Sequence, residues 1–209
     1  MNIDSSENKT SSAARKQPGP ATSTTAVGNI EALRSKHYNA TAVAIERIHD
    51  ELLIVQVRPD DFQLKFTPGQ YTVLGLGYWE PRLAETQDEQ LDEADRRRLI
   101  KRAYSISCPL LDEEDHLVQA TERYEQEFYI TLVRFNDAQP PALTPRLFAL
   151  SPGDRLFMSP HPHGHYSLDR VQPDDDVVLV STGTGEAPHN AMLAQLLSRG
   201  HTGRIVNVN

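Results

Sequence analysis

The sequence predicts a mixed fold, in which an antiparallel β-barrel is followed by the start of a parallel α/β domain. Several short runs with strand-like alternation, separated by turn residues, occupy the middle of the chain, and this pattern is typical of an antiparallel barrel. From residue 176 the pattern changes to a continuous apolar run, a glycine-containing loop and a helical apolar stripe. That succession predicts the opening β-α-β unit of a parallel sheet.

Composition excludes several classes of protein. The chain has 209 residues, of which 38% are hydrophobic and 24% charged, as in an ordinary globular protein. Cys108 is the single cysteine, which rules out an internal disulfide or a four-cysteine metal site. A net charge of −8 argues against a nucleic-acid partner. With no apolar run of about 18 residues and no signal-peptide pattern, we expect a cytoplasmic protein without a membrane partner.

Three segments differ in composition. Residues 1–35 are rich in Ser, Thr, Ala and Pro without periodicity, so we expect a disordered tail. Residues 36–172 carry the barrel pattern, and residues 173–209 carry the α/β pattern. About two strands are too few for a complete parallel α/β domain, so we expect that domain to be incomplete and the protein truncated.

Each barrel strand is predicted from alternation between turn signals such as Pro68-Gly69 and Pro152-Gly153. The predicted strands cover residues 41–48, 52–58, 70–76, 103–108, 128–135 and 155–159. Two helical pieces are expected between them, at 83–100, where acids precede bases as the helix dipole favours, and at 145–150. In the last segment we expect a strand at 177–180, a helix from Pro188 to Gly200 and a strand at 204–209.

The first motif, Arg102-Ala103-Tyr104-Ser105, lies on a predicted strand. Arg102 and Tyr104 are two residues apart and therefore share one face of that strand. A guanidinium can form a fork of hydrogen bonds to phosphate oxygens, and a tyrosine ring can stack on a flat heterocycle, beside which Ser105 would place a hydroxyl. These groups fit FAD, which combines a flat redox ring with a pyrophosphate. The alternative is a barrel strand with an exposed arginine and a packed tyrosine.

A second set of residues supports the same ligand. Tyr129 is placed to make a second ring contact from a neighbouring strand. After Ala142 and Leu143, Thr144 is predicted as the N-cap of a short helix with Pro145 at its first position. Free backbone N–H groups at such a helix start would bind a pyrophosphate. A capped helix without a ligand is the alternative.

A third motif, Gly183-Thr184-Gly185, follows a buried strand and precedes a helix, which is the context that a nucleotide-binding glycine loop needs. Ala187-Pro188 stands where the usual dinucleotide fingerprint has its third glycine.

In this order, the three motifs resemble the ferredoxin–NADP reductase superfamily over residues 37–209, and the bacterial ferredoxin/flavodoxin–NADP reductases most. The resemblance implies an FAD-binding Greek-key barrel and an NADP-binding α/β domain. It also implies hydride transfer from NADPH to the flavin and electron transfer to ferredoxin or flavodoxin. By motif, FAD would be held by Arg102, Ala103, Tyr104, Ser105, Tyr129, Ala142, Leu143, Thr144 and Thr184. NADP would be held by Gly183, Thr184, Gly185 and Pro188. Tyr104 and Ser105 would be the catalytic residues.

The chain departs from that family at two places. Pro141 stands where the family has a glycine, and the insertion before Arg102 is longer than usual. Two other functions remain open: the reductase component of an oxygenase, which would normally carry a four-cysteine iron–sulfur domain, and a flavin-binding module without turnover. The His161-Pro162-His163-Gly164-His165 run is expected to be a turn, and we expect no metal site.

Overall fold

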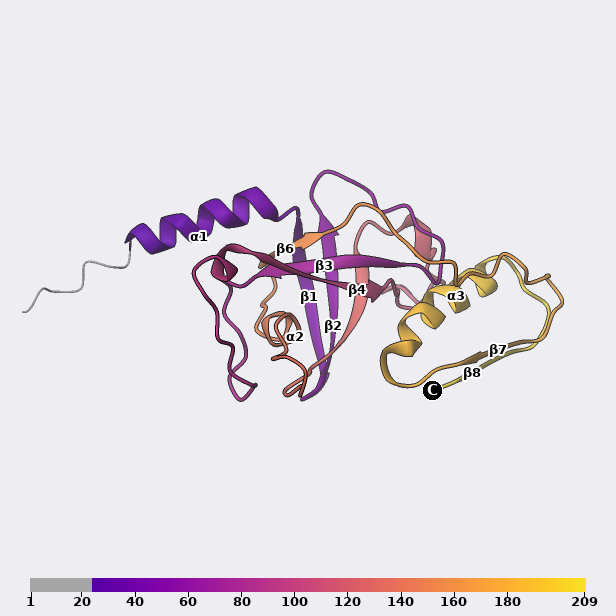
Figure 1. The fold of residues 1–209 in the computed structure, drawn as a ribbon. Helices are drawn as coiled ribbons and strands as arrows, with labels where there is room; N and C mark the ends of the chain where they lie inside the picture. Colours follow the sequence, from indigo (N-terminus) through magenta and orange to yellow (C-terminus); the bar gives the residue numbers. More distant parts are fainter. Residues whose placement is uncertain (1–23) are drawn as a thin grey trace, which may run out of the picture.

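The computed structural model describes residues 24–209. Of the predicted disordered tail, residues 1–23 lie outside the described residues, whereas residues 24–35 form most of helix α1 (Thr24–His37), which differs from the expectation. Figure 1 shows α1 projecting from the sheet on the side opposite to the C-terminal unit. Arg34 near its end forms an ion pair with Glu80 at 2.6 Å, so a tertiary contact holds the helix end that the composition could not reveal.

Six antiparallel strands form the central sheet in the order β4-β3-β6-β1-β2-β5. The strands are β1 (Ala40–His49), β2 (Leu52–Pro59), β3 (Tyr71–Gly77), β4 (Leu99–Ser105), β5 (Gln126–Thr131) and β6 (Arg155–Met158). Their alternating buried positions supply the core, whose largest fully buried side chains include Phe128, Leu53, Leu74 and Leu156. The predicted antiparallel domain is confirmed, with strand ends that differ by a few residues.

The sheet is open rather than a closed barrel, so the closure expected from the sequence is wrong. Its two end strands, β4 and β5, share no ladder of hydrogen bonds within residues 24–209. One isolated bridge beyond the end of β4 joins them, in which the Ser107 N–H donates to the Glu127 carbonyl at 2.8 Å. A seam therefore runs between β4 and the chain that follows β5.

Glu127 is a buried carboxyl at this bridge, and its side chain accepts a hydrogen bond from the Ser107 hydroxyl at 3.2 Å. Burial raises the pKa of Glu127 above its usual value. Because its pKa is raised in the folded chain, Glu127 keeps its proton there to a higher pH than in the unfolded chain. Stability is therefore lost as the pH rises from the unfolded-state pKa through the folded-state pKa. Glu127→Gln should therefore raise the melting temperature at pH 8 and leave it unchanged near pH 4. Melting curves across this range check the prediction, and an equal gain at both pH values would contradict it.

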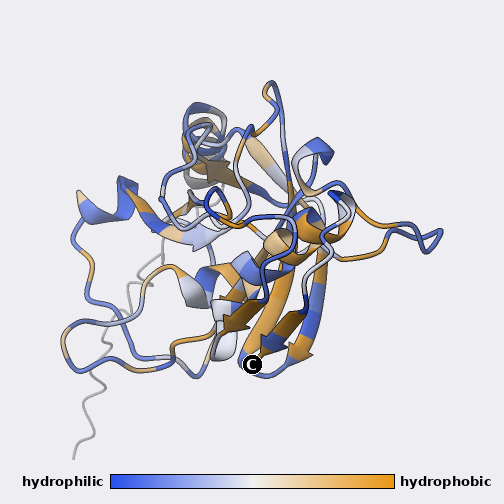
Figure 2. Cartoon of the chain, turned by 90° about the vertical axis from the view of Figure 1, so that its right-hand side faces the viewer, coloured by the Kyte–Doolittle hydropathy of each residue, from blue (hydrophilic) through white to orange (hydrophobic). Residues whose placement is uncertain are grey.

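The C-terminal unit contains β7 (Val177–Val180), η3 (Gly183–Gly185), α3 (Glu186–Ser198) and β8 (Ile205–Val208). Strands β7 and β8 pair in parallel, as predicted. Both strands are largely apolar, and they lie beside the C-terminus in Figure 2. Helix α3 packs between the central sheet and β7. Its Ala191 and Ala194 belong to the core of the sheet, whereas its Met192 and Leu196 pack on β7.

A close backbone approach fixes the linker between the units. Gly69 has φ +101°, and a Cβ at this position would lie 1.9 Å from the Tyr166 carbonyl oxygen. Only glycine fits there. The turn between β2 and β3 that was predicted from Pro68-Gly69 therefore also packs closely against Tyr166, in the segment that leads to β7.

The helix predicted at 83–100 is absent, and this prediction is wrong. Residues 78–98, which we name the insertion segment, form a loop whose single helical turn is η1 (Asp95–Arg97). The other short helices are η2 (Ala120–Glu122) and α2 (Thr144–Leu147). Charge pairs four residues apart stabilise a helix by only about 0.2–0.5 kcal/mol each, and residues 83–100 offer no apolar stripe to bury. Among residues 24–209, no helix combines the length and hydropathy needed to cross a bilayer.

Candidate functional site

A cleft of about 180 Å³ opens at the seam between β4 and the chain that follows β5. Arg102 lines it from β4, and the opposite wall comes from the segment between β5 and α2. The lining residues are Arg102, Val133, Asn136, Gln139, Pro140, Pro141, Ala142, Leu143 and Thr144. Four residues assigned to FAD by motif are thus brought to one place from strands and loops about 40 positions apart in the sequence.

Arg102 and Tyr104 project from the same side of β4, as predicted, because their directly opposite partners on β3 are Leu74 and Thr72. The Arg102 guanidinium is exposed, donates one hydrogen bond to the neighbouring Lys101 carbonyl and pairs with no carboxylate among the described residues. It is therefore a free cation at the mouth of the cleft. Tyr104 is half-buried against the core, and burial raises the pKa of its hydroxyl, which stays protonated.

The hydroxyls of Tyr104 and Ser105 have no hydrogen-bond partner within the part of the chain that the structure describes. Ser105 is the last residue of β4 and lies opposite Tyr71, whereas Ala103 is exposed. The two hydroxyls are available to a ligand, whereas the Tyr104 ring packs against the core.

Thr144 does not cap α2 as predicted. The N-cap residue is Leu143, and no side-chain cap is present. The Thr144 hydroxyl instead accepts a hydrogen bond from the Val133 N–H at 3.2 Å, which ties the start of α2 to the chain leaving β5. The bond joins two lining residues of the wall opposite Arg102. Within residues 24–209 the N–H groups of Ala142, Leu143 and Thr144 donate to no protein acceptor, so they remain free for an anionic ligand.

Tyr129 connects β5 with α3. Its hydroxyl accepts a hydrogen bond from the Asn190 side-chain amide at 3.0 Å, and burial raises the pKa of Tyr129 to about 12. Strand β5 also contacts η3, which carries Thr184. The predicted ring contact and the predicted nucleotide loop therefore lie on neighbouring elements.

Tyr129→Phe should weaken the attachment of α3, because the Asn190 amide loses its acceptor while the ring stays. A neutral hydrogen bond of this kind contributes about 0.5–1.5 kcal/mol to stability. Denaturant titrations of Tyr129→Phe, Asn190→Ala and the double variant measure the coupling of the two side chains. Strictly additive losses would show that the hydrogen bond contributes nothing.

The glycine loop forms a tight turn at the start of α3. Gly183 adopts φ +56°, a left-handed conformation, and Gly185 immediately precedes the first turn of α3. A Cβ on Gly185 would lie 3.2 Å from the Ser181 side chain, so this turn leaves little space for a larger residue. Pro188 is buried in the first turn of α3, where it needs no hydrogen-bond partner for its nitrogen.

Two groups of residues near the cleft escaped the sequence-based prediction. Phe135 is 73% exposed and lies between the lining residues Val133 and Asn136. A large exposed aromatic side chain beside a cleft is a signal that only the structure supplies, because the apolar alternation of 128–135 predicts a buried strand there. The second group, around Arg146, lies behind the cleft and is described below.

The chain was compared with known proteins. No protein-family model matches it. It is 34% identical over 125 residues to the ferredoxin–NADP reductase of Pseudomonas aeruginosa, a match that covers 60% of this chain and 36% of the relative. It is 28% identical over 156 residues to the flavodoxin/ferredoxin–NADP reductase of Rhodobacter capsulatus, covering 74% of this chain and 45% of the relative. The chain thus spans less than half the length of these relatives.

Solved structures show the same fold. A ferredoxin NADP⁺ reductase from Neisseria gonorrhoeae with bound FAD and NADP superposes with a TM-score of 0.55 at 18% identity, covering 81% of this chain and 56% of the other. The CS-b5R domains of human Ncb5or give a TM-score of 0.60 at 22% identity, covering 82% and 42%. The predicted resemblance to bacterial ferredoxin/flavodoxin–NADP reductases is confirmed.

Proposed function

We propose that this chain is the FAD-binding part of an oxidoreductase that moves electrons between NADPH and a one-electron carrier such as ferredoxin or flavodoxin. The observation that carries the proposal is the cleft at the open seam, which Arg102 lines together with residues 142–144, whose N–H groups have no protein acceptor within residues 24–209. The names of the relatives support the reductase activity and the partners.

The lining of the cleft fits a pyrophosphate. Arg102 supplies a planar cation that can bond two phosphate oxygens at once, and the N–H groups of residues 142–144 supply neutral donors opposite it. Thr144 holds that wall against β5 through Val133. Arg102 and the N–H groups of residues 142–144 would together bind the two phosphates of a diphosphate. This arrangement favours FAD over FMN, which has a single phosphate.

Bound FAD would supply the redox chemistry, accepting hydride from NADPH and releasing electrons one at a time. The chain's own residues would bind and orient it. The Tyr104 ring offers a flat, half-buried surface beside Arg102, and its hydroxyl stays protonated as a hydrogen-bond donor. The free Ser105 hydroxyl could exchange a hydrogen bond with a ring nitrogen.

The α3 side would receive the nicotinamide nucleotide. Gly183 and Gly185 follow the half-buried strand β7 and precede the 13-residue helix α3, so no side chain at these two positions covers the backbone at the helix start. The Tyr129–Asn190 hydrogen bond holds this loop against β5. The two proposed ligands would therefore approach each other between β5 and η3.

Reconstitution of the purified chain with FAD tests the proposal. Binding should shift the flavin absorption bands and quench flavin fluorescence, and NADPH with a small dye acceptor should report turnover. An unchanged flavin spectrum at high FAD would refute the flavin site. Flavin binding without NADPH oxidation is also expected of an FAD-binding part by itself and leaves the proposal standing, whereas a preference for NADH in any turnover would refute the assignment of NADP.

A further inference from the structure

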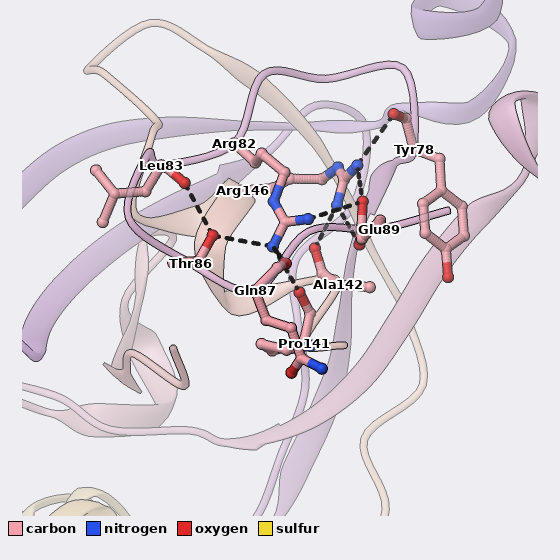
Figure 3. A network of polar contacts seen from close by, with 9 residues as sticks. All are labelled: Tyr78, Arg82, Leu83, Thr86, Gln87, Glu89, Pro141, Ala142 and Arg146. Carbon is pink, nitrogen blue, oxygen red and sulfur yellow. Dashed lines mark hydrogen bonds and ion pairs between the residues drawn. The ribbon is translucent and has the colours of Figure 1, made fainter. Parts of the chain in front are cut away.

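A buried ionic cluster lies directly behind the cleft wall and consists of Arg82, Glu89 and Arg146 (Figure 3). The exposed fractions of these side chains are 20%, 6% and 3%. The two terminal nitrogens of Arg146, Nη1 and Nη2, donate to the Glu89 carboxylate at 2.9 and 2.7 Å. Arg82 Nη1 lies 3.3 Å from the same carboxylate. The cluster joins the insertion segment to helix α2.

Beyond Glu89, the two guanidiniums mainly hold backbone carbonyl groups. Arg146 donates to Ala142 O at 2.7 Å and to Tyr78 O at 3.2 Å. Arg82 donates to Pro141 O at 3.2 Å and to Gln87 O at 2.8 Å. Two successive carbonyls of the cleft wall, those of Pro141 and Ala142, are thus directed into the cluster by one arginine each (Figure 3).

This arrangement determines where the next N–H groups point. In a planar trans peptide, the N–H of a residue points away from the carbonyl of the residue before it. With Pro141 O and Ala142 O held by the cluster, the N–H groups of Ala142 and Leu143 must point away from it. Both residues line the cleft, and neither N–H has an acceptor within residues 24–209.

The charges of the cluster are also unbalanced. Two guanidiniums, which remain protonated in proteins, share one carboxylate, and the Nε atoms of Arg82 and Arg146 are buried without a hydrogen-bond partner in the described chain. A surplus positive charge of low solvent exposure therefore lies behind the wall whose N–H groups point outward. An anion in the cleft would complement it.

We propose that Arg82 and Arg146 are positioning residues for the diphosphate of the flavin cofactor, acting through the peptide groups of residues 141–143. The insertion segment thereby becomes part of the cofactor site without touching the ligand. This inference rests on the proposed function, because it takes FAD as the occupant of the cleft.

Arg82→Met tests the proposal, since it removes the donors to Pro141 O and Gln87 O at the less buried of the two arginines. The dissociation constant for FAD should rise about tenfold, whereas that for FMN, which lacks the diphosphate, should rise less than about threefold. Arg98→Met is the matched control, because Arg98 belongs to the same segment but, among the described residues, pairs with the nearby Asp95 alone, so its loss should leave both constants unchanged. Thermal melting of each apo variant reports its stability.

The outcomes separate the two proposals. If the wild-type chain binds FAD no better than FMN, the diphosphate site is refuted and the proposed function fails with it. If the wild type prefers FAD and Arg82→Met keeps the same preference, or weakens both flavins equally, the positioning role alone is overturned. If Arg82→Met melts below the assay temperature, Arg82→Lys replaces it: a lysine keeps the charge but cannot bridge the same acceptors. Its FAD preference should fall, and an unchanged preference would overturn the role.

Discussion

Replacing Arg102 by alanine should weaken FAD binding at least tenfold while changing FMN binding little. A hydrogen bond from a charged donor contributes about 1.5–3 kcal/mol, and FMN lacks the pyrophosphate that the guanidinium is proposed to meet. The arginine is exposed and, in the part of the chain that the structure describes, bonds only the Lys101 carbonyl, so its removal should leave the melting temperature of the apo chain unchanged. Fluorescence titrations with both flavins give the two constants.

Lys101→Ala is the control for this experiment. Lys101 is the adjacent cation of β4 but projects from the other side of the strand, where its ammonium lies 3.8 Å from the centre of the Phe157 ring. Its loss removes one positive charge without changing the lining of the cleft. FAD affinity should stay within about twofold, because an exposed charge on the other side of the strand is screened by salt. An equal loss for both variants would show a general charge effect, and equal losses for FAD and FMN would place Arg102 away from the pyrophosphate.

The strands were predictable from sequence because their signal is local. Alternation of apolar residues sets which side of a strand is buried, and turns such as Pro152-Gly153 fix where strands end. Arg102 and Tyr104 share a face for the same reason. The glycine loop could also be predicted, since Gly183 adopts a left-handed conformation that favours glycine shortly before a helix.

The errors have a common physical cause, which is contact between residues far apart in the sequence. Charges in 83–100 predict a helix locally, but Glu89 is bound by Arg146, 57 positions away. The end of α1 depends on Glu80, and Thr144 bonds Val133 instead of capping its own helix. In each case a tertiary partner outweighs a local preference of about 2 kcal/mol or less.

Barrel closure failed as a prediction for a related reason. Alternation identifies strands but contains no information on whether the first and last strands of the sheet meet. Within residues 24–209 one isolated bridge, between Ser107 and Glu127, joins the two ends of the sheet, and the cleft lies at the open seam. The feature that the sequence could not predict is thus the one that gives Arg102 access to a ligand.

The largest effect on stability is expected for Arg146→Leu. The substitution leaves the buried Glu89 carboxylate with Arg82 alone and leaves the carbonyls of Ala142 and Tyr78 without this donor. Breaking one side of a buried ion pair costs about 3–5 kcal/mol. For a chain of this size, the loss corresponds to a fall in melting temperature of roughly 6–20 °C. Arg97→Leu, which removes an exposed ion pair with Glu93 in the same segment, should cost less than about 1 kcal/mol.

A double-mutant cycle shows whether the cost comes from the ion pair itself. Glu89→Gln should be strongly destabilising in the wild type and much less so in Arg146→Leu, because the bidentate partner is already gone. The coupling free energy between the two positions should exceed about 1 kcal/mol, as for contacting residues in one network. If the two losses simply add, Arg146 stabilises the chain by packing on the Tyr78 ring, 5.1 Å from its guanidinium carbon, and the insertion segment is held by something other than charge.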